Sequence, residues 1–131
     1  MGIRLNLTIP IWTLGICRLD PGHPIPAWVL RSPFYTITRS ADEMSTICDG
    51  QAIPEGVKAD EGWRAIKLEG PFDFSLIGIM LSVSMPLAEA GISILAVSTF
   101  DTDYVLIKET NLPKAMEALE AAGHTIRCLD R

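Results

Sequence analysis

The sequence has 131 residues, enough for one ordinary domain or for two very small ones. Apolar residues make up 48% of it, and the formal net charge is −5. The basic residues form no stripe, so the charge pattern argues against nucleic acid or an anionic membrane as a partner. No apolar stretch reaches the ~20 residues that cross a bilayer, and no signal peptide pattern is present, so we expect a cytoplasmic protein.

The thiols and imidazoles are too scattered for a metal centre. Cys17, Cys48 and Cys128 form no pair at ligand spacing, and His23 and His124 fall in separate regions. An odd number of cysteines without a secretion signal also argues against a disulfide framework. We therefore expect buried, inert thiols, and neither a metal nor a cofactor.

The N-terminal half, residues 1–60, has irregular signals. Residues 5–19 are typical of one long strand or of two strands with a bend near Pro10. The further expected elements are a single helical turn at 25–31, strands at 34–39 and 44–48, and a linker at 51–61.

The C-terminal half, residues 61–131, gives clearer signals. Leu76, Met80, Val83, Leu87 and Ala90 recur at helical spacing, with a start near Ser75 and an end at Gly91. Pro86 predicts a bend, because proline removes one helical hydrogen bond. The other expected elements are strands at 63–69, 92–98, 104–108 and 124–128 and a helix from Asn111 to Gly123. The strand at 92–98 is apolar and β-branched, which favours the centre of a sheet. The order β-α-β-β-α-β predicts an α+β, ferredoxin-like unit.

A weak internal echo connects the two halves. When Ile37–Cys48 is set over Val97–Lys108, an offset of sixty residues, both segments have the pattern strand, short acidic turn, strand. We interpret the pair as a duplicated hairpin whose first copy has eroded helices, so that the chain has the organisation of a tandem repeat.

Two polar regions of the C-terminal half are candidates for a binding site. The free amides expected at the helix start, around Ser75, Leu76 and Ile77, favour a carboxylate. Asp101 and Asp103, in the turn between two strands, favour an ammonium or guanidinium group. A zwitterion needs both kinds of partner, so we expect the two regions to face one groove. The alternatives are that Asp73 and Ser75 only cap the helix, that Asp101 and Asp103 are only turn residues, and that Phe72, Phe74 and Phe100 only anchor loops.

The order of these signals resembles the ACT domain. The resemblance is carried by Glu69-Gly70-Pro71, Ser75–Ile79, Leu87–Ile94 and Val97-Ser98-Thr99, and more weakly by Phe34-Tyr35, Thr38-Arg39 and Glu43–Ser45. In particular, the sequence resembles the regulatory ACT domains of aspartate kinases and their small stand-alone tandem relatives, which include the family of CASTOR-type amino-acid sensors. The resemblance implies an ACT domain at 61–131 packed with a divergent ACT-like unit at 1–60. It also implies an amino-acid site at the seam of ACT units. Carried over by position, the ligand-binding residues would be Gly70, Pro71, Phe72, Asp73, Phe74, Ser75, Ile77, Gly78, Ile79, Thr99, Phe100, Asp101, Thr102 and Asp103.

Three functional hypotheses follow. The first is a non-catalytic regulatory or sensor protein that binds a small molecule, with an amino acid as the expected ligand. The second is a structural or interaction module that keeps the ACT fold and forms a homodimer, or binds a protein partner, without a ligand. The third is an enzyme, which the sequence disfavours because no nucleophile stands beside a base and no phosphate-binding glycine loop is present.

Overall fold

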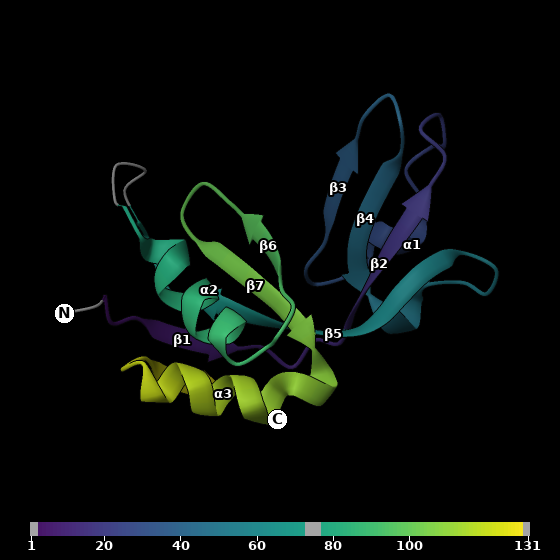
Figure 1. Ribbon diagram of the computed structural model, residues 1–131. Coiled ribbons are helices and arrows are strands. Elements are labelled where there is room, and N and C mark those ends of the chain that lie inside the picture. The colour runs from purple at the N-terminus through teal and green to yellow at the C-terminus, as the bar shows by residue number, and fades with distance from the viewer. Residues whose placement is uncertain (1–2, 73–76, 130–131) are drawn as a thin grey trace. The chain divides into compact units, whose positions relative to one another are not determined.

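The structure is a computed structural model that describes residues 3–72 and 77–129. By its internal contacts the chain divides into two units (Figure 1). Unit 1 consists of Met1–Ile11 and Arg64–Arg131, and unit 2 is Trp12–Trp63. The expected division into 1–60 and 61–131 differs from this one chiefly in the first eleven residues, which join the C-terminal unit because their strand pairs there.

Unit 1 contains a mixed sheet in the order β6-β7-β5-β1-β8. Its strands are β1 (Asn6–Ile9), the second part of β5 (Lys58–Leu68), β6 (Leu95–Ser98), β7 (Asp103–Lys108) and β8 (Thr125–Cys128). β1 lies antiparallel to β5 and parallel to β8, so it is inserted between the first and last strands of the expected β-α-β-β-α-β unit. Such long-range pairing has no local sequence signal.

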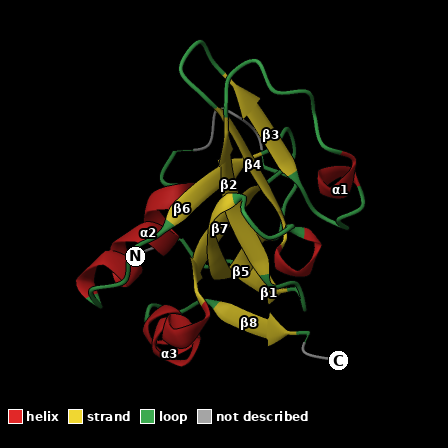
Figure 2. Cartoon of the chain, turned by 90° about the vertical axis from the view of Figure 1, so that its right-hand side faces the viewer, coloured by secondary structure: helices red, strands yellow, loops and turns green. Residues whose placement is uncertain are grey.

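Two helices, α2 (Ile79–Glu89) and α3 (Leu112–Ala121), lie on one side of the unit 1 strands (Figure 2). Gly91 and Gly123 follow them in left-handed backbone conformations, as expected for helix ends. Asn111 and Pro113 mark the start of α3, as predicted. The helices and the sheet enclose a core of buried apolar side chains, which are Leu5, Leu7, Ile9, Ile66, Leu68, Val83, Leu87, Ile92, Val105, Ile107, Leu112, Ala115 and Leu119.

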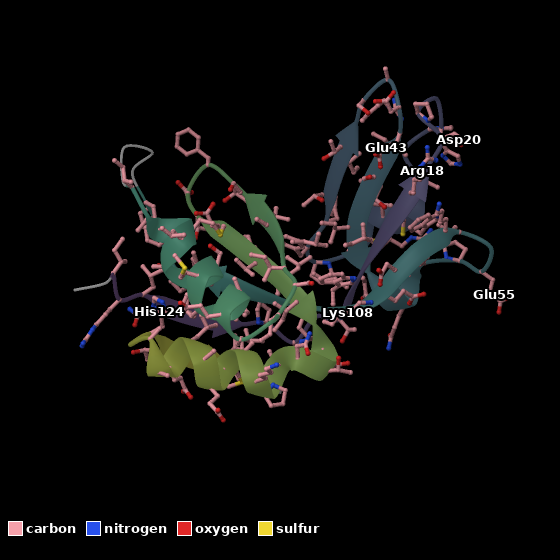
Figure 3. The ribbon with its side chains drawn as sticks, viewed as in Figure 1. Arg18, Asp20, Glu43, Glu55, Lys108 and His124 are labelled. Carbon is pink, nitrogen blue, oxygen red and sulfur yellow. The ribbon has the colours of Figure 1, made fainter. Side chains whose placement is uncertain are left out.

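Helix α2 continues through Pro86, and His124 replaces the hydrogen bond that proline removes. Pro86 has no N–H to offer the carbonyl of Ser82. The buried ring of His124, just before β8, donates instead from Nε2 to Ser82 O at 2.8 Å. Its Nδ1 accepts the backbone N–H of Leu5 at 3.1 Å, which fixes the neutral Nε2–H tautomer. One side chain therefore connects α2, the start of β1 and the approach to β8 (Figure 3).

Unit 2 has a four-stranded sheet in the order β3-β4-β2-β5. Its strands are β2 (Leu14–Leu19), β3 (Thr36–Arg39), β4 (Met44–Asp49) and the first part of β5. The helical segments are short: α1 (Ala27–Leu30) has four residues, and the 3-10 turn η1 (Gly50–Ala52) has three. A small core packs beneath α1, formed by Cys17, Val29 and Cys48 with Trp28, Ile37, Ile53, Val57 and Ala59 around it.

The two units repeat one hairpin. Thr36–Arg39 and Met44–Asp49 in unit 2 have the same lengths as Leu95–Ser98 and Asp103–Lys108 in unit 1, and every bound differs by 59 residues. The registers agree too, since Thr36 faces Ile47 and Leu95 faces Leu106. The predicted echo is therefore real, but its offset of sixty was one residue too large. Similar residue types, such as Glu43 and Asp103, suggested the wrong alignment.

Three expectations about individual elements were wrong. β5 begins at Lys58, inside the segment 51–61 that we expected to be a linker. Helix α2 begins at Ile79 and not near Ser75, because Gly78 before it has a φ of +85°, outside the helical range. Within the segment 92–98, only Leu95–Ser98 forms a strand, and this edge strand pairs with β7 alone.

The short 3-10 turn η2 (Glu109–Asn111) leads from β7 into α3. No helix of the described residues is both long and apolar enough to cross a membrane.

Candidate functional site

The loop after β5 is fastened to the turn between β6 and β7. The backbone N–H of Phe72 donates to Asp101 O at 2.9 Å. Thr102 Oγ1 donates to Leu68 O, the last carbonyl of β5. Gly70 permits this approach, since a Cβ at that position would lie 2.5 Å from Asp101 O. The loop at Gly70 and the acidic turn at Asp101 therefore lie side by side.

The β6–β7 turn holds its shape through a threonine. Thr99 N donates to Thr102 O at 2.8 Å, and Thr99 Oγ1 accepts from Thr102 N at 3.2 Å. Asp103 Oδ1 accepts the hydroxyl of Ser98 at 2.6 Å. One oxygen of Asp103 is thus engaged within the hairpin, which favours the turn-residue alternative for this aspartate over a ligand contact.

Beside this junction lies a pocket of about 290 Å³, called here the unit 1 pocket. It is lined by Lys67, Glu69, Gly70, Pro71, Asp101 and Thr102. Lys67 Nζ and Glu69 Oε1 are 3.4 Å apart, and both side chains are about one-third exposed. A hydrogen bond from Thr8 lowers the pKa of Glu69, and the nearby Lys67 ammonium lowers it further, although partial burial acts in the opposite direction.

The unit 1 pocket is equipped to hold charge. It offers one ammonium, two carboxylates and a hydroxyl around a loop whose backbone is fixed by hydrogen bonds. Such a set complements a small molecule that carries both an ammonium and a carboxylate. In the described part of the chain, no cluster of three or more His, Cys, Asp or Glu side chains has the arrangement of a metal site.

The remaining predicted residues lie elsewhere. Asp73, Phe74 and Ser75 lie outside the described residues. Phe72 packs against the unit 1 core, as the loop-anchor alternative expected, whereas Phe100 is 79% exposed. Three further positions surround the start of α2: Ile77 is 90% exposed, Gly78 precedes the helix, and Ile79 begins it.

Of the residues expected at the helix start, Ser75 and Leu76 lie outside the described residues. Gly78 borders an apolar hollow of about 420 Å³ with Ile3, Leu81, Ser82, Met85, Pro86 and Ala122. The single groove for a carboxylate and an ammonium therefore stays a prediction. The predicted residues that share the unit 1 pocket are Gly70, Pro71, Asp101 and Thr102.

Sequence reasoning missed Lys67 and Glu69. Both belong to the alternating segment Trp63–Glu69, in which Ile66 and Leu68 are buried. Alternation places Lys67 and Glu69 on the opposite face, immediately before the loop. That position was available from the sequence and could have identified both residues.

The thiols behave mostly as expected. Cys17 and Cys48 are buried, and Cys128 is partly exposed. Burial raises the pKa of the Cys48 thiol to about 12, and the neighbouring Cys17 contributes to the shift. Burial also raises the pKa of Cys17. Both thiols therefore stay protonated and unreactive at neutral pH.

Comparison with protein families identifies the fold. The family model described as "ACT domain" matches residues 58–121, and a second model, for an N-terminal domain, matches residues 12–56. The solved structure of protein Atu0741 from Agobacterium tumefaciens is 41% identical, with a TM-score of 0.93, covering 99% of this chain and 97% of that one. The chain belongs to the ACT domain family.

Other similar proteins are more distant. The human cytosolic arginine sensor for mTORC1 subunit 1 is 36% identical over 61 residues, or 46% of this chain and 18% of the sensor. This chain thus spans less than one-fifth of that relative. The regulatory subunit of aspartate kinase from Thermus thermophilus has a TM-score of 0.67 at 13% identity, covering 92% of this chain and 99% of that one. The latter likeness shows that the two share a fold.

Proposed function

We propose that this ACT protein is a non-catalytic sensor that binds a small amino acid at the unit 1 pocket and regulates another protein in the cytoplasm. ACT membership and homology to an amino-acid sensor support a regulatory role. The observation that carries the proposed site is the junction of Phe72 N with Asp101 O at 2.9 Å. It places the carboxylate-bearing turn beside the end of β5, where Lys67 and Glu69 lie.

In this proposal each charged side chain has a separate role. Lys67 pairs with the ligand carboxylate, which competes with its contact to Glu69. Asp101 and Glu69 accept the ligand ammonium, since charge-assisted hydrogen bonds are stronger than neutral ones. Of the residues carried over from the ACT family, Gly70 and Pro71 shape the wall and Thr102 holds the turn. Phe72 anchors the loop in the core, while Thr99 and Asp103 keep the hairpin rigid.

A thermal-shift screen of the full chain against the twenty amino acids tests this function. A ligand at a hundred times its Kd stabilises a protein by about 2.7 kcal/mol, which raises the Tm by on the order of 10 °C. We expect one amino acid, or one chemical class, to produce such a shift. A flat response to all twenty would refute the proposed function.

Two substitutions then locate the site. Asp101→Asn and Lys67→Gln each remove one charge, and we expect each to weaken binding by about ten-fold to a hundred-fold in isothermal titration, as loss of a charged hydrogen bond does. Glu120→Gln on the exposed side of α3 is the matched control and should bind like the parent. Parent-like affinity in both pocket variants would move the site elsewhere.

A second candidate function is self-association without a ligand. The observation in its favour is the apolar surface around the start of α2, where Ile77, Leu81 and Met85 are 90%, 55% and 48% exposed. Exposed apolar patches of this kind mark protein contacts. Light scattering separates the two functions: a dimer that forms without any amino acid, and that Leu81→Lys disrupts, favours this candidate.

A further inference from the structure

The unit 2 sheet has a pocket of its own. It has a volume of about 260 Å³ and is lined by residues of the second half of β2 and around the starts of β4 and β5. Its polar lining consists of Arg18, Glu43, Ser45, Lys58 and Asp60, and the rest is Ile16, Cys17 and Ala59. All of these residues belong to unit 2, and the regulatory role proposed above assigns nothing to them.

Strand register places two cations side by side in this pocket. Arg18 faces Lys58 across the β2–β5 pair and Ser45 across the β2–β4 pair. Directly opposed like charges destabilise a sheet. Within the described residues, the Lys58 ammonium has no hydrogen bond or ion pair that would offset this repulsion. An anion bound between Arg18 and Lys58 would offset it.

The Arg18 guanidinium is only loosely engaged. Its Nη2 donates to Asp42 O at 3.2 Å, and its Nη1 lies 3.9 Å from Asp20 Oδ1. Asp20 is almost fully exposed, so water screens this contact strongly. Arg18 therefore keeps donors for another anion, and Figure 3 shows it on the strand beside the turn that carries Glu43.

The two acidic side chains of the pocket are held in place. Glu43 Oε1 accepts the Ser45 hydroxyl at 2.6 Å, and Asp60 Oδ1 accepts Trp63 Nε1 at 3.3 Å. Glu43 keeps further acceptor positions beyond its bond to Ser45. The pocket thus has two cations and two fixed anions, the complement of a molecule that carries both charges.

The turn beside this pocket repeats the chemistry of the turn in unit 1. Ser40 N donates to Glu43 O at 2.9 Å, and Ser40 Oγ accepts from Glu43 N at 3.3 Å. Thr99 and Thr102 make the corresponding bonds 59 residues later. Each pocket combines residues of or beside this turn with residues near the end of another strand, β2 in unit 2 and β5 in unit 1. The two pockets therefore share their place beside the turn, while the charges of their lining side chains differ.

We propose that the unit 2 pocket is a second binding site, which takes a small zwitterionic carboxylate. Its carboxylate lies between Arg18 and Lys58, and its ammonium faces Glu43 and Asp60. Binding relieves the repulsion between the two cations, so the site favours molecules with a carboxylate over simple cations. This site does not depend on the unit 1 pocket.

A titration of the uniformly 15N-labelled full chain followed by amide NMR tests the second site, with glycine, acetate and methylammonium as probes. We expect glycine to shift the amides of Arg18, Ser45 and Lys58 in a saturable manner. Acetate should shift the same amides with lower affinity, and methylammonium should leave them unmoved. Absence of a saturable shift with both carboxylates would overturn the proposal, as would equal shifts with methylammonium.

Variants separate the two pockets. Arg18→Gln and Lys58→Gln should each weaken glycine binding at the unit 2 amides by at least about ten-fold, the loss of one charge-assisted contact. Lys67→Gln, in the unit 1 pocket, is the matched control and should leave those shifts unchanged. Both unit 2 side chains are exposed, so the variants keep the fold, which dispersed amide spectra would verify. Parent-like binding in both Arg18→Gln and Lys58→Gln would refute the site.

Discussion

His124→Leu should destabilise unit 1, because the imidazole makes hydrogen bonds to two backbone groups. The change removes the acceptor of the buried Leu5 N–H and the donor to the Ser82 carbonyl. A buried unsatisfied polar group costs about 1–3 kcal/mol. Because the Ser82 contact is only partly buried, we expect a combined loss of about 2–4 kcal/mol in the free energy of unfolding.

Pro86→Ala tests whether His124 replaces the helical hydrogen bond to Ser82. Alanine restores an N–H at position 86, which can donate to Ser82 O in the ordinary helical pattern. The substitution should therefore stabilise the His124→Leu variant more than it stabilises the parent, by about 1 kcal/mol. This coupling would show that His124 and the helix compete for the same carbonyl.

The assay is urea unfolding followed by far-UV circular dichroism. Helices α2 and α3 both belong to unit 1, whereas all three tryptophans, Trp12, Trp28 and Trp63, lie in unit 2. Fluorescence would therefore report unit 2. The exposed His23 supplies the control, since His23→Leu should change stability by no more than about 0.5 kcal/mol. Strict additivity of the His124 and Pro86 changes, or parent-like stability of His124→Leu, would refute the reasoning.

Two further predictions concern ionisation. Thr8→Val should raise the pKa of Glu69 toward its ordinary value of 4.5, measured by carbon-13 NMR titration, because the Thr8 hydroxyl is the main cause of the lowered pKa. A pKa that is lower in the folded protein than in the unfolded chain stabilises the fold above about pH 4.5, and this stabilisation is lost as the pH falls through the lowered pKa. The variant should therefore be less stable than the parent at neutral pH, and equally stable below the lowered pKa. An unchanged Glu69 titration would contradict this prediction. Cys128 should react first with a thiol reagent at neutral pH, while Cys17 and Cys48 react only on unfolding, since burial raises their pKa values; simultaneous labelling of all three would contradict the burial.

Elements with local start and stop signals could be predicted from the sequence. The helix α3 is the clearest case, since Asn111, Pro113 and Gly123 mark both ends. The predicted start of α2 near Ser75 was wrong because Gly78 has a φ of +85°, which excludes it from the helix. From the sequence alone, such a glycine cannot be distinguished from one that a helix tolerates. The insertion of β1 between β5 and β8 was missed because strand pairing over more than a hundred residues leaves no periodic signal.

The candidate site also combines residues that have local sequence signals with contacts that depend on long-range structure. Asp101 could be predicted because turns have characteristic residues, whereas Gly70 was carried over from the resemblance to the ACT domain. That their backbones meet, with a Cβ at Gly70 only 2.5 Å from Asp101 O, depends on tertiary structure. Lys67 and Glu69 belong to a strand and carry no turn signal, although the strand alternation placed them beside the loop.

The repeated hairpin separates the features that the two units share from those in which they differ. Both units keep the same hairpin register and the same Ser or Thr turn, and each has a charged pocket beside it. The helical layer differs: α2 has eleven residues and encloses a large core, whereas α1 has four and covers a small one. Burial of apolar area is the main stabilising contribution, so unit 1 gains more stability from its helices than unit 2 does. Helix length and core size differ between the units, whereas the turn and the position of a pocket beside it are common to both. In the two binding sites proposed above, we therefore expect the charges at the strand ends to set ligand specificity.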